Sequence, residues 1–256
     1  MSLALEAQDW NEFEFQPKSK GKARKLKKIK QKAQRTENII SQLTCINPKT
    51  DNQRKVFDYY DQGYHIYMDG VAGTGKTFLS LFLALDEIKF SSQYNHVVIV
   101  RSAVPSRDIG HLPGNKAEKE AVYEEPYAEI CSELFGRGDA YSILKQKGII
   151  EFTTTSHLRG VTMRDCIVIV DEVQNLDFGE LDTIMTRIGE NARVIFCGDS
   201  KHQADLRKHQ GRGEINQFLP IIQSLDSFRG VTFRETDIVR SGLVKEYILE
   251  RNRRGL

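Results

Sequence analysis

The chain alternates short, strongly hydrophobic runs with longer stretches of mixed polarity. Several of the hydrophobic runs are almost continuously apolar and rich in β-branched residues, which is typical of strands buried on both faces of a parallel sheet. The predicted strands are YHIYM from Tyr64, HVVIV from His96, GIIEF from Gly148, CIVIV from Cys166, RVIFC from Arg193 and GVTF from Gly230.

Stretches with a helical pattern separate these runs, at 77–89, about 117–134, 179–188 and 213–225. The alternation of strands and helices predicts an α/β fold with a central, mainly parallel sheet flanked by helices. A polar insertion, 105–129, carries two glycines and three prolines. Connections of that length are usually functional loops or surfaces for partners.

Composition fits a globular protein, since 39% of the 256 residues are hydrophobic and 28% are charged. No apolar run is long enough to span a bilayer, and the start of the chain lacks the features of a signal peptide. We therefore expect a cytoplasmic protein that does not enter membranes. Cys45, Cys131, Cys166 and Cys197 lie far apart and are expected to be reduced thiols. The histidines show no metal-ligand spacing, so no structural zinc is predicted.

Basic charge is concentrated near the N-terminus. Ten of the 37 Lys and Arg residues lie between Lys18 and Arg35, without any Asp or Glu, which leaves 27 basic against 35 acidic residues elsewhere, a net charge of −8. We predict that residues 1–38 form a flexible arm that contacts nucleic acid, and that 39–256 form the globular domain. The alternative is a solvated tail that only aids solubility.

A glycine-rich segment, GVAGTGKT, lies between the first predicted strand and the first predicted helix. Glycines let such a loop curl its N–H groups around phosphate oxygens, and the helix directs its positive end at the same anion. Lys76 would reach the β- and γ-phosphates, and the Thr77 hydroxyl would ligate Mg²⁺. Gln53 could contact an adenine edge or lie on a solvated helix face. The predicted nucleotide-binding residues are Gln53, Gly70, Val71, Ala72, Gly73, Thr74, Gly75, Lys76, Thr77 and Phe78.

Two later strands also end in polar residues. CIVIVDEVQN places Asp171 where it can hold Mg²⁺ through water, and Glu172 where it can polarise an attacking water as a general base. This pair favours hydrolysis over phosphorylation of a small molecule. RVIFCGDSKHQADL leads to Gln203, which is either a sensor of the γ-phosphate or a turn residue. The fork of Arg240 suits the charge on a transferring phosphoryl group, although Arg240 is one arginine among many.

Together these segments resemble the PhoH-like proteins, which are P-loop ATPases related to the superfamily-one helicase core. The similarity covers roughly 39–251, and the LPG…EK…PY insertion is its most family-specific part; the small size is similar to that of a phage-encoded member. The matching segments are GVAGTGKT, RSAVPSRDIGHLPGNKAEKEAVYEEPY, SHLRGVTMRDCIVIVDEVQN, TRIGENARVIFCGDSKHQADL and DIVRSGLVKEYI.

The resemblance implies a RecA-like domain with ATP and Mg²⁺ as cofactors, and RNA or single-stranded nucleic acid as partner. It implies that Lys76 and Thr77 bind phosphate and metal, that Asp171 and Glu172 form the Walker B pair, and that Gln174 completes the DExQ box.

The resemblance further implies that Gln203 is the γ-phosphate sensor, although GDSKHQ is one residue longer than the family's G-D-x-x-Q. Arg240 corresponds to an arginine finger, and Arg159 falls on a motif arginine. About fifty residues follow Gln203, too few for a second RecA-like domain, so we expect Arg240 to reach a neighbouring subunit's ATP in a ring, with a hexamer fitting the resemblance.

We therefore expect an ATP hydrolase that translocates on or remodels RNA or single-stranded DNA. The alternative is an ATP-gated nucleic-acid-binding module that hydrolyses slowly and unwinds nothing.

Overall fold

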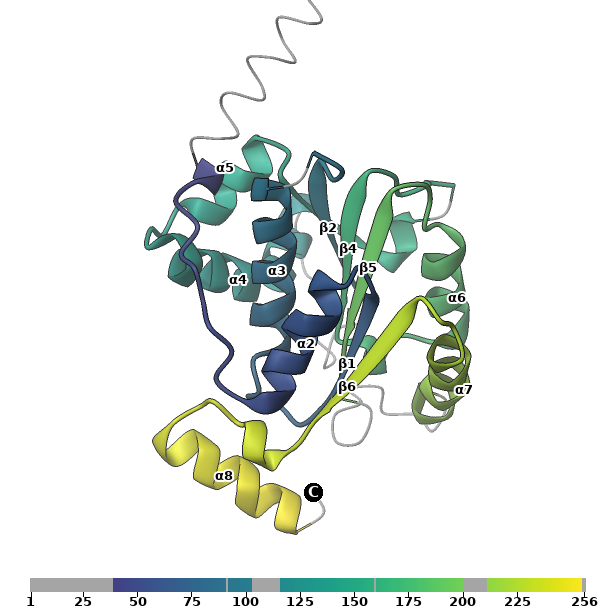
Figure 1. The fold of residues 1–256 in the computed structure, drawn as a ribbon. Helices are drawn as coiled ribbons and strands as arrows, with labels where there is room; N and C mark the ends of the chain where they lie inside the picture. Colours follow the sequence, from purple (N-terminus) through teal and green to yellow (C-terminus); the bar gives the residue numbers. More distant parts are fainter. Residues whose placement is uncertain (1–38, 91, 103–115, 159, 200–210, 255–256) are drawn as a thin grey trace, which may run out of the picture.

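A computed structural model describes residues 39–90, 92–102, 116–158, 160–199 and 211–254 of the chain (Figure 1). Within these residues one sheet of six strands has the order β3-β2-β4-β5-β1-β6, and its neighbouring strands pair in parallel. The strands are β1 (His65–Gly70), β2 (His96–Arg101), β3 (Ile150–Thr154), β4 (Cys166–Asp171), β5 (Ala192–Cys197) and β6 (Phe228–Phe233).

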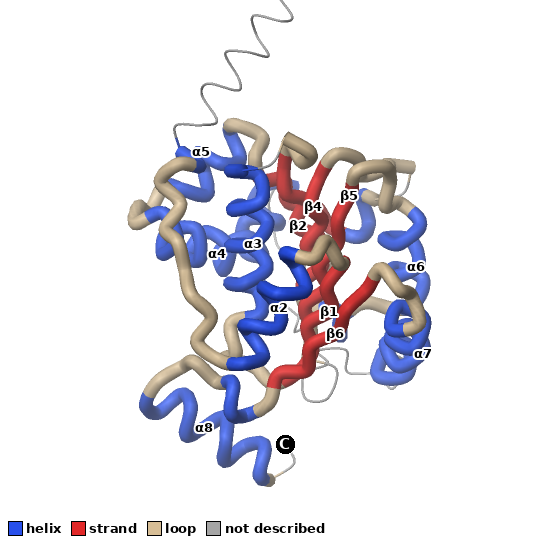
Figure 2. Tube along the Cα trace, viewed as in Figure 1, coloured by secondary structure: helices blue, strands red, loops and turns tan. Residues whose placement is uncertain are grey.

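Helices cover both faces of this sheet, with α2, α3, α4 and α5 on one side and α6 and α7 on the other (Figures 1 and 2). The helix α8 follows the edge strand β6 and lies beyond the end of α2. The α-helices are α2 (Asp51–Asp61), α3 (Lys76–Phe90), α4 (Lys116–Phe135), α5 (Ala140–Gln146), α6 (Phe178–Thr186), α7 (Gly211–Gln223) and α8 (Gly242–Arg253), with short 3-10 turns η1 (Thr155–His157), η2 (Val173–Asn175) and η3 (Glu235–Asp237).

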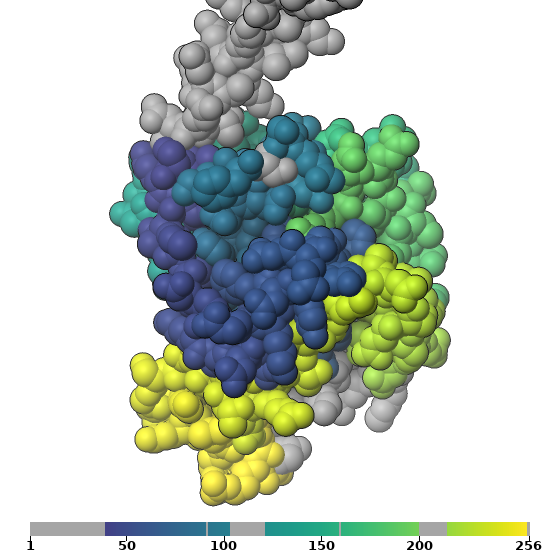
Figure 3. Space-filling view, viewed as in Figure 1, coloured from purple at the N-terminus to yellow at the C-terminus, as the bar shows by residue number. Residues whose placement is uncertain are grey.

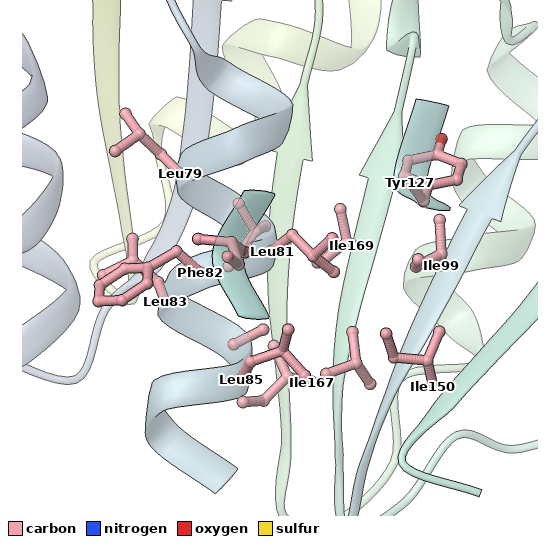
Figure 4. Close-up of a cluster of buried hydrophobic side chains, with 14 of the residues drawn as sticks. Leu79, Leu81, Phe82, Leu83, Leu85, Ile99, Tyr127, Ile150, Ile167 and Ile169 are labelled. Atoms are coloured by element: carbon pink, nitrogen blue, oxygen red, sulfur yellow. The ribbon is translucent and has the colours of Figure 1, made fainter. Parts of the chain in front are cut away.

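The strands are apolar at nearly every position because each face packs against helices. In β4, Ile167 and Ile169 join the hydrophobic cluster beneath α3, while Val168 and Val170 join the cluster beneath α6 and α7. Figure 4 shows the first of these layers, where leucines of α3 pack on the isoleucines of the sheet. The continuous hydrophobicity of CIVIV is thus the result of two separate cores.

The predicted α/β class and the six predicted strands are confirmed. The strand predicted at 148–152 forms two residues later, as β3, because Gly148 has a φ of 67° and belongs to the turn that closes α5. The four predicted helices are present with ends shifted by one or two residues, whereas α2, α5 and α8 were not among them. All four cysteines are free, and Cys45 is the exposed one.

The strand order brings the carboxyl ends of β1, β5 and β4 together at one edge of the sheet. The carboxyl end of β1 leads into the glycine-rich loop, β5 lies beside β1, and β4 lies beside β5. Polar residues that follow these strands are therefore neighbours in space although they lie far apart in the sequence. None of the helices in the described part of the chain is both long and apolar enough to cross a bilayer.

Candidate active site

The glycine-rich loop adopts a backbone that side chains would obstruct. Gly70, Gly73 and Gly75 have φ angles of 122°, 79° and 84°, in the region that favours glycine. A Cβ added to Gly70 would lie 2.1 Å from the carbonyl oxygen of Phe233 in the paired strand β6. The first glycine is thus fixed by strand packing, and the other two give the loop its curl.

Lys76 begins α3, a helix of 15 residues, so its side chain and the unpaired N–H groups of the first turn face the same space. Its Nζ donates to the carbonyl oxygens of Gly70 at 2.7 Å and Val71 at 2.9 Å. Burial lowers the pKa of the Lys76 ammonium, and the carboxylate of Asp199 opposes this shift. The ammonium is therefore held in the mouth of the loop, where an anion would relieve the cost of its burial.

Thr77 and Asp171 meet across the site, as the sequence predicted. The Thr77 hydroxyl donates to Asp171 Oδ1 at 3.1 Å, and Tyr127 donates its phenolic proton to Asp171 Oδ2 at 2.9 Å. A hydroxyl beside a carboxylate is a donor set that suits a hard divalent cation such as Mg²⁺. These residues fit the predicted metal.

Glu172 lies directly after β4 in the left-handed region, with φ 54° and ψ 46°, a conformation that costs about 1–2 kcal/mol for a residue with a side chain. Gln174 Nε2 donates to Glu172 Oε2 at 2.5 Å, and Gln174 Oε1 accepts the N–H of Asp199 at 3.0 Å. Burial raises the pKa of the Glu172 carboxyl, and the charge of Asp171 raises it further. Gln174 therefore connects the ends of β4 and β5 and orients a carboxylate of increased basicity.

Gln53 is a buried strut of the loop, with 4% of its surface exposed. Its Nε2 donates to the Thr74 carbonyl at 3.0 Å, and its Oε1 accepts the Lys49 N–H at 2.7 Å. The alternative of a solvated helix face is therefore wrong, because α2 turns this residue inward onto the loop.

Arg240 lies beside the glycine-rich loop of its own chain. The N–H of Val239 donates to the carbonyl of Gly73 at 3.1 Å, and the Arg240 Cγ would lie 3.2 Å from a Cβ at Gly73. In Figure 3 the yellow-green to yellow residues of β6 and the segment after it lie against the blue residues of α2. This return of the chain brings Arg240 to the cavity lining.

A cavity of about 870 Å³ collects these groups. Two residues predicted to bind the nucleotide support the loop from within instead: Val71 packs on Ile238 and Ile248, and Thr74 donates through Oγ1 to the Val71 carbonyl at 3.0 Å. Gln203 and Arg159 lie outside the described residues, as does the basic arm from Lys18 to Arg35. The predicted residues that line the cavity are Gln53, Ala72, Gly73, Gly75, Lys76, Thr77, Phe78, Asp171, Glu172, Gln174 and Arg240.

Sequence reasoning missed Arg101, Tyr127 and Asp199. Arg101 is the last residue of β2, the register partner of Asp171 and part of the cavity lining. Its place at the carboxyl end of a buried strand was a usable signal. The place of Tyr127 had no such signal, because α4 reaches the site only through the packing of helices on the sheet.

The parallel sheet with a phosphate-binding loop between β1 and α3 and an acidic pair after β4 is a RecA-like P-loop NTPase fold. The PhoH-like protein of Bacillus subtilis (strain 168) is 30% identical over 204 residues, which make up 79% of this chain and 63% of that protein. The PhoH-like protein of Mycobacterium leprae (strain TN) is 28% identical over 204 residues, 79% of this chain and 57% of that protein. The chain thus spans less than two thirds of the length of these relatives.

Among solved structures, the large terminase from the thermophilic bacteriophage D6E has a TM-score of 0.48 at 11% identity, over 80% of this chain and 50% of that one. The model of the PhoH-like protein family matches residues 45–250. Because this match extends over most of the chain and includes every element of the site, the chain belongs to the PhoH-like protein family.

Proposed function

We propose that the chain is an ATP hydrolase whose turnover is coupled to the binding of RNA or single-stranded nucleic acid. The coupled step is translocation on this nucleic acid or its remodelling. The observation that carries the proposal is the meeting of the Thr77 hydroxyl and the Asp171 carboxylate, 3.1 Å apart, beside the ammonium of Lys76. Two segments 94 residues apart in the sequence together form a site for a phosphate chain and its cation. Family membership supports the same function.

Each group of the site has a distinct task. Lys76 and the first turn of α3 bind the phosphates, and Thr77 and Asp171 hold Mg²⁺, which when bound neutralises charge that develops on the phosphate oxygens. Glu172 is oriented by Gln174, and its raised pKa makes it a better proton acceptor from an attacking water. Arg240 is placed to stabilise negative charge on the transferring group.

The position of Arg240 beside its own loop favours action within one chain. A ring, and a hexamer in particular, stays a prediction, as does the sensor role of Gln203. A cytoplasmic location is likewise part of the proposal.

Nucleic acid is the proposed partner because of the ten basic residues between Lys18 and Arg35. Phosphate contacts of this kind release counterions, so affinity should fall steeply as salt rises. Replacing the ten residues by glutamine should remove most of this salt dependence and leave basal ATP turnover unchanged. Equal salt dependence of the two proteins would contradict a nucleic-acid role for the arm.

The decisive experiment compares ATP turnover with and without RNA or single-stranded DNA, together with unwinding of a partial duplex. We expect turnover that either nucleic acid stimulates, and Glu172→Gln should lower it about 10²–10⁴-fold while nucleotide binding is kept. Turnover without unwinding would favour the ATP-gated binding module, and a protein that neither binds nor hydrolyses ATP would refute the proposal.

A further inference from the structure

The polar insertion ends in a helix that forms one wall of the nucleotide cavity. Pro126, Glu129, Ile130 and Glu133 of α4 line the cavity, whereas Tyr127 points toward the sheet, where Figure 4 shows it beside Ile99 of β2. The ring of Tyr127 packs against Phe152 with centroids 6.0 Å apart, and 1% of the residue is exposed. A phenol buried this deeply needs a hydrogen-bond partner, and it finds one in the site.

The hydroxyl of Tyr127 lies at the carboxyl ends of β2 and β4, where Arg101 and Asp171 are register partners. It directs its proton at Asp171 Oδ2, 2.9 Å away. The other oxygen of the carboxylate, Oδ1, accepts from Thr77. Asp171 therefore has one oxygen bonded to Tyr127 and the other bonded to Thr77, the second predicted metal ligand.

α4 is held by α5 as well as by the strands. Glu124, one turn before Tyr127, accepts a hydrogen bond from Tyr141 at 2.6 Å and an ion-paired one from Lys145 at 2.5 Å, and both partners belong to α5. The position of the phenol is thus set by the contacts of α4 with α5 together with the packing of its ring on the sheet. Pro126 interrupts the helical hydrogen bonds immediately before Tyr127, which allows a local bend there.

We propose that Tyr127 is a positioning residue for Asp171, and that this is a role of the PY sequence in the insertion. Its hydroxyl fixes the rotation of the carboxylate so that Oδ1 faces Thr77, and it keeps Arg101 from pairing directly with Asp171. Without the hydroxyl, the carboxylate is free to turn toward the guanidinium and away from the metal. The inference rests on the proposed function, since it concerns how the same site holds its divalent cation.

Tyr127→Phe tests the proposal, with Tyr141→Phe as its matched control. Both substitutions remove one buried phenolic hydroxyl that is bonded to a carboxylate, and both residues lie in the α4–α5 pair, but only Tyr127 contacts the site. The readout is the affinity for Mn²⁺ in the presence of ADP, followed by electron paramagnetic resonance, together with ADP affinity measured in EDTA. Thermal unfolding of each variant is recorded alongside.

Tyr127→Phe should weaken Mn²⁺ binding about tenfold or more, as the loss of a partner behind a metal ligand typically does, and leave ADP affinity in EDTA unchanged. Tyr141→Phe should lower thermal stability without changing Mn²⁺ affinity, because the Lys145–Glu124 ion pair and the packing of Tyr127 on Phe152 still hold α4 in place. Mn²⁺ binding by Tyr127→Phe within about twofold of the unmodified chain, or an equal loss in Tyr141→Phe, would overturn the positioning role. If Tyr127→Phe does not fold, Tyr127→Met, which also lacks a donor, takes its place with the same criteria. A chain that binds no ADP under either condition would overturn the proposed function itself.

Discussion

Gln53 offers a sharp test of whether the glycine-rich loop is held from behind. Gln53→Met keeps the length and nearly the volume of the side chain but removes both hydrogen bonds of the amide. The Thr74 carbonyl is then left without its partner at a residue with no exposed surface, whereas the N–H of Lys49 lies at the surface and can bond to water.

The expected loss of stability follows from the different exposure of the two hydrogen-bond partners of Gln53. An unsatisfied buried acceptor costs about 1–3 kcal/mol, and a hydrogen bond that water can replace contributes about 0.5–1 kcal/mol. Since the methionine side chain recovers part of this through apolar burial, we expect Gln53→Met to lower the free energy of unfolding by about 2 kcal/mol. Arg54→Ala, at an exposed position of the same helix, is the control and should change stability by less than about 0.5 kcal/mol.

Urea unfolding gives the free-energy change, and fluorescent ATP and GTP analogues report the state of the loop. If Gln53 supports the glycine-rich loop, the affinities for the ATP and the GTP analogue should fall to a similar degree, because the backbone of the phosphate-binding loop is no longer held in place. A variant that unfolds like the unmodified protein but loses a preference for ATP over GTP would refute this reasoning and make Gln53 a contact to the adenine base.

Three further predictions concern other parts of the molecule. Gly70→Ala should prevent folding or lower the free energy of unfolding by more than about 3 kcal/mol, because its Cβ would clash with the carbonyl of Phe233 in β6. Gly230→Ala is the control, since a Cβ there meets open space, and urea unfolding compares the two variants. Burial lowers the pKa of His65 below 6.5, so the stability that its neutral form contributes is complete above pH 6.5 and is lost as the pH falls below that value. His65→Gln should therefore flatten the pH dependence of the urea midpoint, and an unchanged dependence would contradict this. Mixing Arg240→Ala with Glu172→Gln chains should restore no ATP turnover, since Arg240 lies at its own loop, and restored turnover would show that it acts between subunits.

The local sequence was enough to predict the strands, the phosphate loop and the acidic pair. Each depends on a short stretch of chain: a strand buried on both faces must be apolar throughout, and a loop that curls around phosphate must have glycine where φ is positive, as at Gly73 and Gly75. Asp171 and Glu172 were predictable for the same reason, because they lie at the carboxyl end of a buried strand, and that end must lie at the same edge as the loop.

Only the tertiary structure decided which other side chains reach that edge. Tyr127 enters the site through the docking of α4, Gln53 through the inward face of α2, and Arg240 through the return of the chain after β6. The physical reason is that these positions depend on packing between elements far apart in the sequence. The free energy of that packing is spread over many buried contacts, so it leaves no pattern in any one stretch of the sequence. The chemistry of the phosphate loop is thus encoded locally, whereas the residues that hold it in place are selected by the fold.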